Sequence, residues 1–580
     1  MNRYFLTTFA LIAVTISGCA APPMRAPVPM SQAAPDSPAQ PTTPLKTTPT
    51  NTSGAVTLRI GMGEPVINLN PVSASTQADY RITLMTYDFL YRIGPIGVAA
   101  PFLVESASAS EDHKTWTLKL HTGVQFHDGR PLTAQDAAFT LNLFKQHTDS
   151  IWNPPLLPFD KAEAGDDSTL ILHLNTIMPD VSDMLSNFPI LPMHIWKPLD
   201  DGSKDGSKKV MEFDNAQMIG SGPFKLIEFQ PEKMIRLTAV KDHWSMPSVL
   251  DEVIIQFMPD TAAQVQALNK GDIDAIQALQ TVETADALSK AEHIQVVKGA
   301  FEYPAVQVVA INQTDPKSCP NDGICSGHPA LQDVRVRQAL MHAVDRTALA
   351  TAAGFGKPGV QLLPDSLGDW SNTSLEGYAF DVMKANQMLD EAGYKDQDGD
   401  GVREMPDGSR SLVFRHLYVA GADFLKRIDS TLTEAWKKIG VKVEGKGLTV
   451  PELIAGPGIK LDYDLLSIGW AGSGLDPASF LPLAQGSGFG VSNFAGYANP
   501  EYDALVNQQA TETDTAKRKA LMWTMQEIVY RDAPYVIVSY PGSAMAFRTD
   551  HFTGWPTDNN MRIMTLYPGV LTQLKPIAAS

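Results

Sequence analysis

The sequence predicts an α/β protein built of at least two lobes, and three observations lead to this prediction. Segments with the alternating apolar and polar residues of β-strands are interspersed with segments whose apolar residues recur at helical spacing. The chain has 580 residues, which is long enough for two or more domains. Hydrophobic residues make up 44% of it and charged residues 19%, a balance typical of globular proteins with buried cores. No repeat of fixed period is present in the sequence, so we expect no solenoid or propeller.

Residues 1–18 are typical of a secretory signal peptide. Arg3 precedes an apolar run over residues 4–16, which at about a dozen residues is too short to span a bilayer. The run leads into Cys19, which resembles the acylated cysteine of bacterial lipoproteins. We therefore expect lipidation of Cys19 and an extracytoplasmic protein anchored to a bacterial membrane, in the periplasm or at the cell surface. An ordinary secretory signal that ends in a cysteine is the alternative.

Residues 19–54 are expected to form a disordered tether between the lipid and the body of the protein. After Cys19 the segment is nearly all Ala, Pro, Thr, Ser and Gln, so it cannot bury enough apolar surface to offset its ordering entropy. Its prolines favour an extended, semi-rigid spacer of about 3 Å per residue. A mucin-like or wall-penetrating segment is the alternative.

The charge of the chain argues against nucleic acid as a partner. The formal net charge is −18, whereas proteins that bind nucleic acid present basic surfaces. After the signal peptide no apolar run approaches 18 residues, so we expect the body to lie outside the bilayer.

The first part of the body predicts strands and a hairpin. Residues 56–60 and 116–120 alternate apolar and polar side chains, as a half-buried strand does. Residues 123–126 are expected to pair with the second of these strands. The Asp-Gly pair at residues 128–129 then predicts a tight turn.

Two helices are predicted from their caps and their apolar faces. Thr133 is expected to cap a helix, with Asp136 at the third helical position approximating a capping box. Over residues 334–344 the apolar residues share one helical face, and Arg335 and Arg337 fall off it.

The remaining elements continue the alternation of strands and helices. Further strands are expected at residues 170–174, 224–229, 253–257, 306–311, 465–469 and 536–540, and further helices at residues 381–392 and 516–531.

The other two cysteines are expected to form a disulfide. Cys319 and Cys325 bracket a turn-rich loop, and cysteines in an oxidising compartment pair readily. The bridge would stiffen this loop rather than join domains. A metal site is the alternative, but no His or further Cys stands at a suitable spacing.

Five segments, taken in order, resemble the extracytoplasmic solute-binding proteins of family 5, which serve the peptide, dipeptide and nickel type of ABC importer. They are residues 120–136, Gly220-Ser221-Gly222-Pro223-Phe224, Pro259-Asp260 with residues 268–274, residues 333–340 with 343–346, and Trp470 with Asp476-Pro477. Each segment also suits a purely structural role, so these motifs identify the fold without marking the site.

The resemblance implies a two-lobed fold of the periplasmic-binding-protein type (class II, cluster C), with two strands crossing between the lobes. It also implies an extra subdomain in the first lobe. The expected organisation is a signal peptide at 1–18, the tether at 19–54, lobe I at 55–89, 211–300 and 534–580, its extra subdomain at 90–210, and lobe II at 301–533.

The implied function is solute binding without catalysis. The lobes would close by a hinge over a solute and deliver it to the transmembrane subunits of an ABC permease. A peptide is the expected solute, and a sugar, an opine, a metal chelate or another small solute is the alternative. A sensor receptor or holding chaperone without a permease also stays open. The resemblance requires no cofactor, and we expect a monomer.

Four residues are candidates for the ligand site: Glu64, Trp470, Ser473 and Asp476. Dipeptide-binding relatives place an Asp that binds the α-amino group of the ligand at the position of Ser473. A serine there supplies only a dipole, although a buried ammonium needs a compensating anion. Either Glu64 or Asp476 therefore faces the amine, or the ligand is not a short peptide. No arginine matches the one that binds the carboxylate of a dipeptide in those relatives.

Residues 396–407 follow the pattern of an EF-hand calcium loop. The expected Ca²⁺ ligands are Asp396, Asp398, Asp400, Val402 through its carbonyl, Glu404 and Asp407. Position twelve is an Asp rather than the usual bidentate Glu, which should weaken coordination. A hydrated acidic turn is the alternative to this structural Ca²⁺ site.

A lipid-anchored hydrolase is the alternative from another class of protein. The sequence has no Gly-x-Ser-x-Gly elbow and no His-Glu-x-x-His pair, and its 12 histidines are scattered. A pair of carboxylates that cleaves glycosides is a possibility that the sequence leaves open.

Overall fold

A computed structural model describes residues 55–74, 76–94, 99–147, 156, 158–279, 281–300, 304–319, 323–472, 476–489, 491–557 and 567–577. The predicted signal peptide, Cys19 and the tether lie outside these residues. Among the helices that the structure describes, none is long and apolar enough to cross a bilayer.

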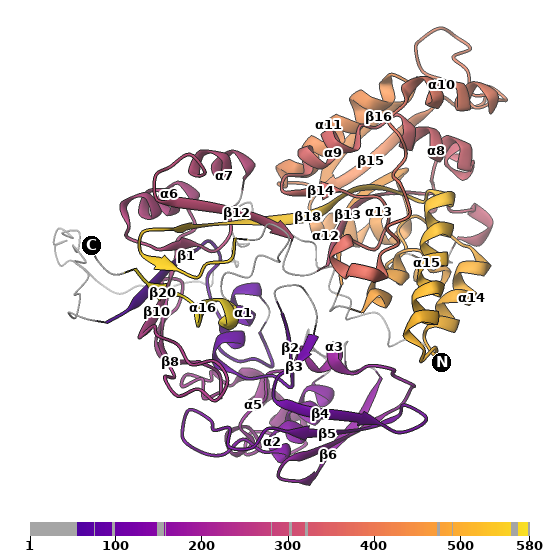
Figure 1. Cartoon of the computed structure of the whole chain (residues 1–580). Coiled ribbons are helices and arrows are strands. Elements are labelled where there is room, and N and C mark those ends of the chain that lie inside the picture. Colours follow the sequence, from indigo (N-terminus) through magenta and orange to yellow (C-terminus); the bar gives the residue numbers. More distant parts are fainter. Residues whose placement is uncertain are drawn as a thin grey trace, which may run out of the picture.

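The protein has two lobes that share one 12-stranded sheet (Figure 1). The strand order along the main path is β16-β15-β17-β13-β18-β11-β1-β10-β9-β8, and β12 and β14 also pair with β18. The strands of the first lobe are β1 (Thr57–Met62), β8 (Phe224–Gln230), β9 (Met234–Ala239), β10 (Glu252–Phe257), β11 (Ala275–Ile276) and β12 (Ile294–Ala300). Those of the second lobe are β13 (Ala305–Ile311), β14 (Gly356–Pro358), β15 (Val413–Val419), β16 (Lys442–Leu448) and β17 (Leu465–Ala471).

Strand β18 (Tyr535–Arg548) joins the two lobes (Figure 1). Its first half pairs with β13 and β14 of the second lobe, and its second half pairs with β11 and β12 of the first. Where it passes between the lobes, a side chain at Gly542 would lie within 2.9 Å of backbone atoms of both Gly299 and Gly356. The absence of a side chain at this position is therefore what lets the three chain segments approach.

The first lobe carries helices and a second sheet. The helices α1 (Gln77–Thr86), α6 (Thr261–Lys270), α7 (Val282–Leu288) and α16 (Pro568–Leu571) belong to it. The second sheet has the order β4-β5-β7-β6, from β4 (Val104–Ala109), β5 (Thr115–Leu120), β6 (Phe159–Asp166) and β7 (Thr169–Leu174). Helix α2 (Ala134–Gln146) packs on β6 and β7. A single hydrophobic cluster runs from Leu58 of the shared sheet to Leu172 of the second sheet, so the two sheets form one lobe.

Short elements complete the first lobe: β2 (Tyr91–Ile93), β3 (Ala99–Pro101), α3 (Ser182–Leu185), α4 (Met193–Trp196), α5 (Lys204–Glu212), β19 (Phe552–Thr553) and β20 (Lys575–Pro576).

The second lobe covers its part of the sheet on both faces. Val309 and Ile311 of β13 face one hydrophobic cluster, and Val306 and Val308 face another, as strand alternation requires. The covering helices are α8 (Val334–His342), α9 (Arg346–Ala353), α10 (Val382–Glu391), α11 (Asp423–Lys437), α12 (Val450–Ala455), α13 (Pro457–Lys460), α14 (Pro500–Gln509) and α15 (Thr515–Asp532). Burial on both faces explains why β13 is apolar at almost every position.

Most of the predicted elements are confirmed, and the predicted α/β class and two-lobed fold are correct. Each predicted strand outside residues 123–126 overlaps a strand of the structure, and the helices at 334–344, 381–392 and 516–531 correspond to α8, α10 and α15. The predicted capping box of α2 is present, with Asp136 accepting the backbone N–H of Thr133 at 2.9 Å. The boundaries drawn between the lobes and the extra subdomain stay predictions.

Two expectations from the sequence are wrong. Residues 123–126 do not pair with β5, which pairs with β4 and β7; Gln125 instead forms an isolated antiparallel bridge with Pro131 across the Asp-Gly turn. Val124 and Phe126 are buried, and their backbone groups hydrogen-bond to Leu132 and Arg130, so their alternation reflects this short pairing over the core. Arg337 was expected off the buried face of its helix, but it is only 4% exposed because its guanidinium binds backbone carbonyls inside the lobe.

Candidate functional site

Glu64 lies in the first lobe, in the loop that follows β1. Its Oε2 is 3.9 Å from Nη1 of Arg81, which α1 presents to it. The Arg81 side chain is 13% exposed and that of Glu64 is 37% exposed, so the pair is partly open to solvent. Sequence reasoning missed Arg81, because its helix carries no motif that marks this position. Together the two side chains place one negative and one positive group side by side on the first lobe.

Trp470 is the penultimate residue of β17 on the second lobe. Its ring packs, half-buried, against the hydrophobic cluster of that lobe, and its Nε1–H donates to the carbonyl of Ser479 at 2.9 Å. The polar edge of the indole is thus already bound, and the rest of the ring is what a ligand could contact. Ser473 lies outside the described residues.

Asp476 follows Trp470 and caps the short 3₁₀ helix Pro477–Leu483. Its Oδ1 accepts the backbone N–H of Ala478 at 2.8 Å, as an N-cap does. Both of its carboxylate oxygens also accept from Nη2 of Arg518 on α15, at 2.7 and 3.0 Å. The charge of Asp476 is therefore compensated by Arg518, a partner that lies far along the sequence and that no local motif indicated.

The loop around Asp476 is where the second lobe meets the first. The backbone N–H of Asp476 donates to Oδ2 of Asp183, which belongs to α3, at 3.3 Å. Nearby, the N–H of Gly472 donates at 2.9 Å to the carbonyl of Pro304, just before β13. Asp476 is thus on the side of the second lobe that faces the first lobe, whereas Glu64 and Arg81 are on the first lobe itself.

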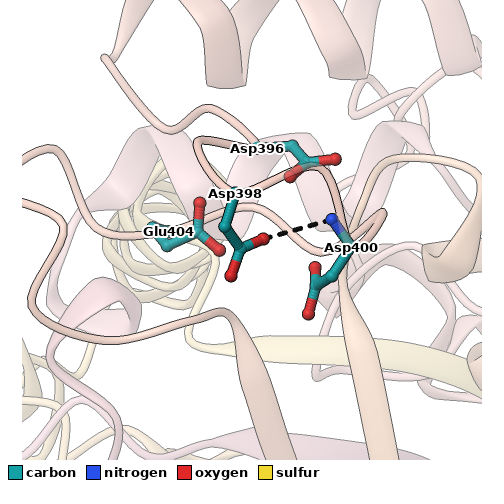
Figure 2. Close-up of side chains that lie close together, drawn as sticks. All are labelled: Asp396, Asp398, Asp400 and Glu404. Carbon is teal, nitrogen blue, oxygen red and sulfur yellow. Dashed lines mark hydrogen bonds between the residues drawn. The ribbon is translucent and has the colours of Figure 1, made fainter.

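The acidic loop lies elsewhere on the second lobe, after α10. It brings together carboxylates of four of the six predicted calcium ligands, which are Asp396, Asp398, Asp400 and Glu404 (Figure 2). Asp407 is not part of this group. Its carboxylate instead accepts the N–H and the hydroxyl of Ser409, and these hydrogen bonds lower the pKa of Asp407.

Cys319 and Cys325 are joined by a disulfide, with their Cα atoms 5.9 Å apart. The N–H groups of Ile324 and Cys325 both donate to the carbonyl of Lys460 at the end of α13. The bridge therefore ties a loop to its own lobe. Residues 320–322, between the two cysteines, lie outside the described residues.

The chain is similar to known proteins over most of its length. Residues 99–490 match the sequence profile of bacterial extracellular solute-binding proteins, family 5 middle. The oligopeptide-binding protein AppA of Bacillus subtilis is 26% identical over 494 residues, which cover 84% of this chain and 86% of AppA. The heme-binding protein A of Haemophilus influenzae is 27% identical over 482 residues, which cover 76% of this chain and 78% of that protein.

Solved structures share the fold. The crystal structure of the ABC transporter substrate-binding protein CtaP from Listeria monocytogenes superposes with a TM-score of 0.74 at 24% identity. The superposition covers 90% of this chain and 99% of CtaP.

Proposed function

Since this chain belongs to the bacterial extracellular solute-binding proteins of family 5, we propose that it captures a peptide-like solute between its two lobes and delivers it to an ABC importer. Proteins of this family are extracytoplasmic transport components that bind solutes and are not enzymes. The proposal for this chain adds four points to this role: hinge closure, a peptide ligand, a permease partner and a lipid anchor.

The observation that carries the proposal is the way the lobes are connected. They share β18, and they also meet where Asp183 of α3 accepts the N–H of Asp476. A strand common to both lobes supports bending at one place, and the contact between Asp183 and Asp476 gives the closed form an interaction that opening would break.

A peptide is the proposed solute for two reasons. The relative AppA is named an oligopeptide-binding protein. In addition, Glu64 and Arg81 present opposite charges at the exit of β1, and a peptide carries an ammonium and a carboxylate. We assign Glu64 to the ammonium, since its pair with Arg81 is looser, at 3.9 Å, than the pair of Asp476 with Arg518 at 2.7 and 3.0 Å, and a serine stands at position 473. Trp470 is assigned a stacking contact with the ligand through its half-buried ring.

The ligand can be identified by native mass spectrometry of the protein purified without unfolding. We expect bound peptides, and isothermal titration calorimetry with synthetic versions should then give affinities. Glu64→Gln should weaken peptide binding by about tenfold, because a charge-assisted contact contributes about 1.5–3 kcal/mol. Glu163→Gln on β6, an exposed carboxylate, is the control and should bind as wild type does.

Other masses would contradict the peptide assignment without removing solute binding. The relative named heme-binding protein A makes a tetrapyrrole one such outcome, which visible absorbance would reveal. A sugar, an opine or a metal chelate would be a further outcome.

The lipid anchor is tested separately, since Cys19→Ala should release the protein from membrane fractions.

A further inference from the structure

The loop between α10 and β15 gathers four carboxylates from a short stretch of chain. Asp396, Asp398, Asp400 and Glu404 each place one carboxylate oxygen within 4.8 Å of those of the others (Figure 2). The three aspartates are exposed and Glu404 is buried. Like charges this close repel one another unless a cation compensates them.

Glu404 supplies an independent observation that points to an ion. The residue is only 6% exposed. Its Oε2 accepts the backbone N–H of Gln397 at 2.7 Å, whereas its Oε1 is buried and has no hydrogen-bond partner among the described residues. Burying a carboxylate oxygen without a donor or a cation is costly. Bridges to Lys395 and Ser411 fix the backbone of Glu404 at the base of the loop, so this oxygen is held in place.

Within the part of the chain that the structure describes, no basic side chain forms an ion pair with these four carboxylates. The neighbouring cations are engaged elsewhere. Arg403 pairs with Asp390 at 2.6 Å, and Lys442 pairs with Glu444 at 2.8 Å. Glu444, and to a smaller extent Asp400, raise the pKa of Lys442. The Lys442 ammonium therefore feels the negative charge of Asp400 without forming an ion pair with it.

We propose that this loop binds one Ca²⁺ through Asp396, Asp398, Asp400 and Glu404. Asp396, Asp398 and Asp400 stand at positions one, three and five of the calcium-loop pattern, and the buried Glu404 stands at position nine. Glu404 thereby takes the role that position twelve usually has, since Asp407 binds Ser409 instead. The carbonyl of Val402 stands at position seven, where calcium loops use a backbone oxygen.

The donor set favours Ca²⁺ over other common metals. All of the donors are oxygens, whereas zinc sites are built from Cys and His. Mg²⁺ demands near-octahedral geometry and retains its waters, so a site built of several protein carboxylates favours the larger Ca²⁺.

The ion would stabilise the second lobe at a place away from the first lobe. Figure 1 shows α10 at the end of the second lobe that is distant from the first. From within the loop, Arg403 donates to Asn386 on α10 and to the carbonyl of Ile439 after α11, at 2.9 Å each. Fixing the loop therefore reinforces the packing of these two helices, and this effect is independent of solute capture.

Calcium binding can be measured on the full chain after treatment with EGTA and desalting. Titration with CaCl₂ in a calorimeter should show one site with a dissociation constant between about 10⁻⁵ and 10⁻³ M. The melting temperature should rise when Ca²⁺ is added at millimolar concentration. Glu404→Gln should weaken binding by about tenfold or more and abolish the rise in melting temperature, and MgCl₂ should bind more weakly than CaCl₂.

Asp407→Asn is the matched control, because it removes a carboxylate of the same loop that lies outside the group. Its calcium affinity should equal that of wild type. Asp398→Asn, at an exposed position, gives a second test if Glu404→Gln does not fold. Absence of binding heat and of a melting shift in wild type overturns the proposal, as does undiminished affinity in the folded Glu404 or Asp398 variant.

Discussion

At the scale of single residues, His328 shows how a backbone environment selects one protonation state. The residue is fully buried. Its Nδ1 accepts the N–H of Ala330 at 3.2 Å, and its Nε2 donates to the carbonyl of Ser411 at 3.0 Å. Protonating Nδ1 would place its N–H against the N–H of Ala330, and two donors cannot form a hydrogen bond. Burial, together with the nearby Arg410, lowers the pKa of His328 to about 4.

This environment makes stability depend on pH. An unfolded histidine has a pKa near 6.5, so between about pH 6.5 and 4 the unfolded chain binds a proton that folded His328 does not. The free energy of unfolding should therefore fall as the pH drops through this range, by about 1–3 kcal/mol from this residue. His328→Asn keeps an N-cap acceptor and should reduce the decline by that amount. Urea denaturation at pH 7 and 4.5 measures it, and equal declines in both proteins would contradict the assignment.

The candidate site was predictable from the sequence only in part. The family motif singled out Trp470 and Asp476, and Trp470 lies near the end of β17, as the strand predicted at residues 465–469 implies. Their partners were not predictable, because Arg518 is 42 residues from Asp476 in sequence and meets it only through the packing of α15. The role of Asp183 was missed for the same reason, since it depends on how the lobes approach.

At the scale of secondary-structure elements, Arg337 closes the C-terminal end of α15. Its Nε and Nη2 donate to the carbonyl of Asp532 at 3.0 and 2.7 Å, and its Nη1 donates to the carbonyl of Leu331 at 2.7 Å. Helices end with carbonyls that have no partner within the helix, and a buried end needs outside donors. Arg337 supplies them from α8.

Arg337→Lys should therefore destabilise the protein although it keeps the charge. An ammonium lacks the planar fork of donors that reaches these carbonyls together, so about 2–4 kcal/mol of unfolding free energy should be lost. Arg335→Lys is the control, since Arg335 is exposed on the same helix and should change stability by less than about 0.5 kcal/mol. Denaturation with urea at neutral pH distinguishes the two variants.

The wrong expectations about elements have a common physical origin. Hydrophobic periodicity reports which side chains are buried, not which segment a strand pairs with or how far it extends. Val124 and Phe126 alternate with polar residues and are buried, yet their segment pairs with residues 130–132 across the turn and not with β5. In strand β18 the paired backbone extends beyond the apolar pattern. Gly542 interrupts that pattern, so only residues 536–540 were predicted of a strand that reaches Arg548.

At the scale of the whole molecule, the contact between Asp183 and Asp476 is one that separation of the lobes would break. It joins α3 of the first lobe to the start of the 3₁₀ helix Pro477–Leu483 of the second. A partly buried hydrogen bond of 3.3 Å is worth about 0.5–1.5 kcal/mol, which is enough to change the proportion of closed molecules severalfold.

Asp183→Ala should therefore favour the open form of the protein. Distances between spin labels placed on the two lobes should shift toward longer values, and the ligand should bind severalfold more weakly than to wild type. Glu163→Ala, on β6 of the same lobe, should leave both the distances and the affinity unchanged. Identical distance distributions in wild type and Asp183→Ala would show that this contact does not hold the lobes together.

The central place of β18 also bears on how the polypeptide is made. A ribosome finishes β11 and β12 long before it reaches residues 542–548, the segment that both strands pair with. Until then the nascent chain holds two sheet edges that await a partner, and such edges invite aggregation. The lobe that is synthesised first is thus the one whose sheet is completed last. That delay suits a polypeptide destined for export, since only a loosely folded chain can be threaded through a translocation pore.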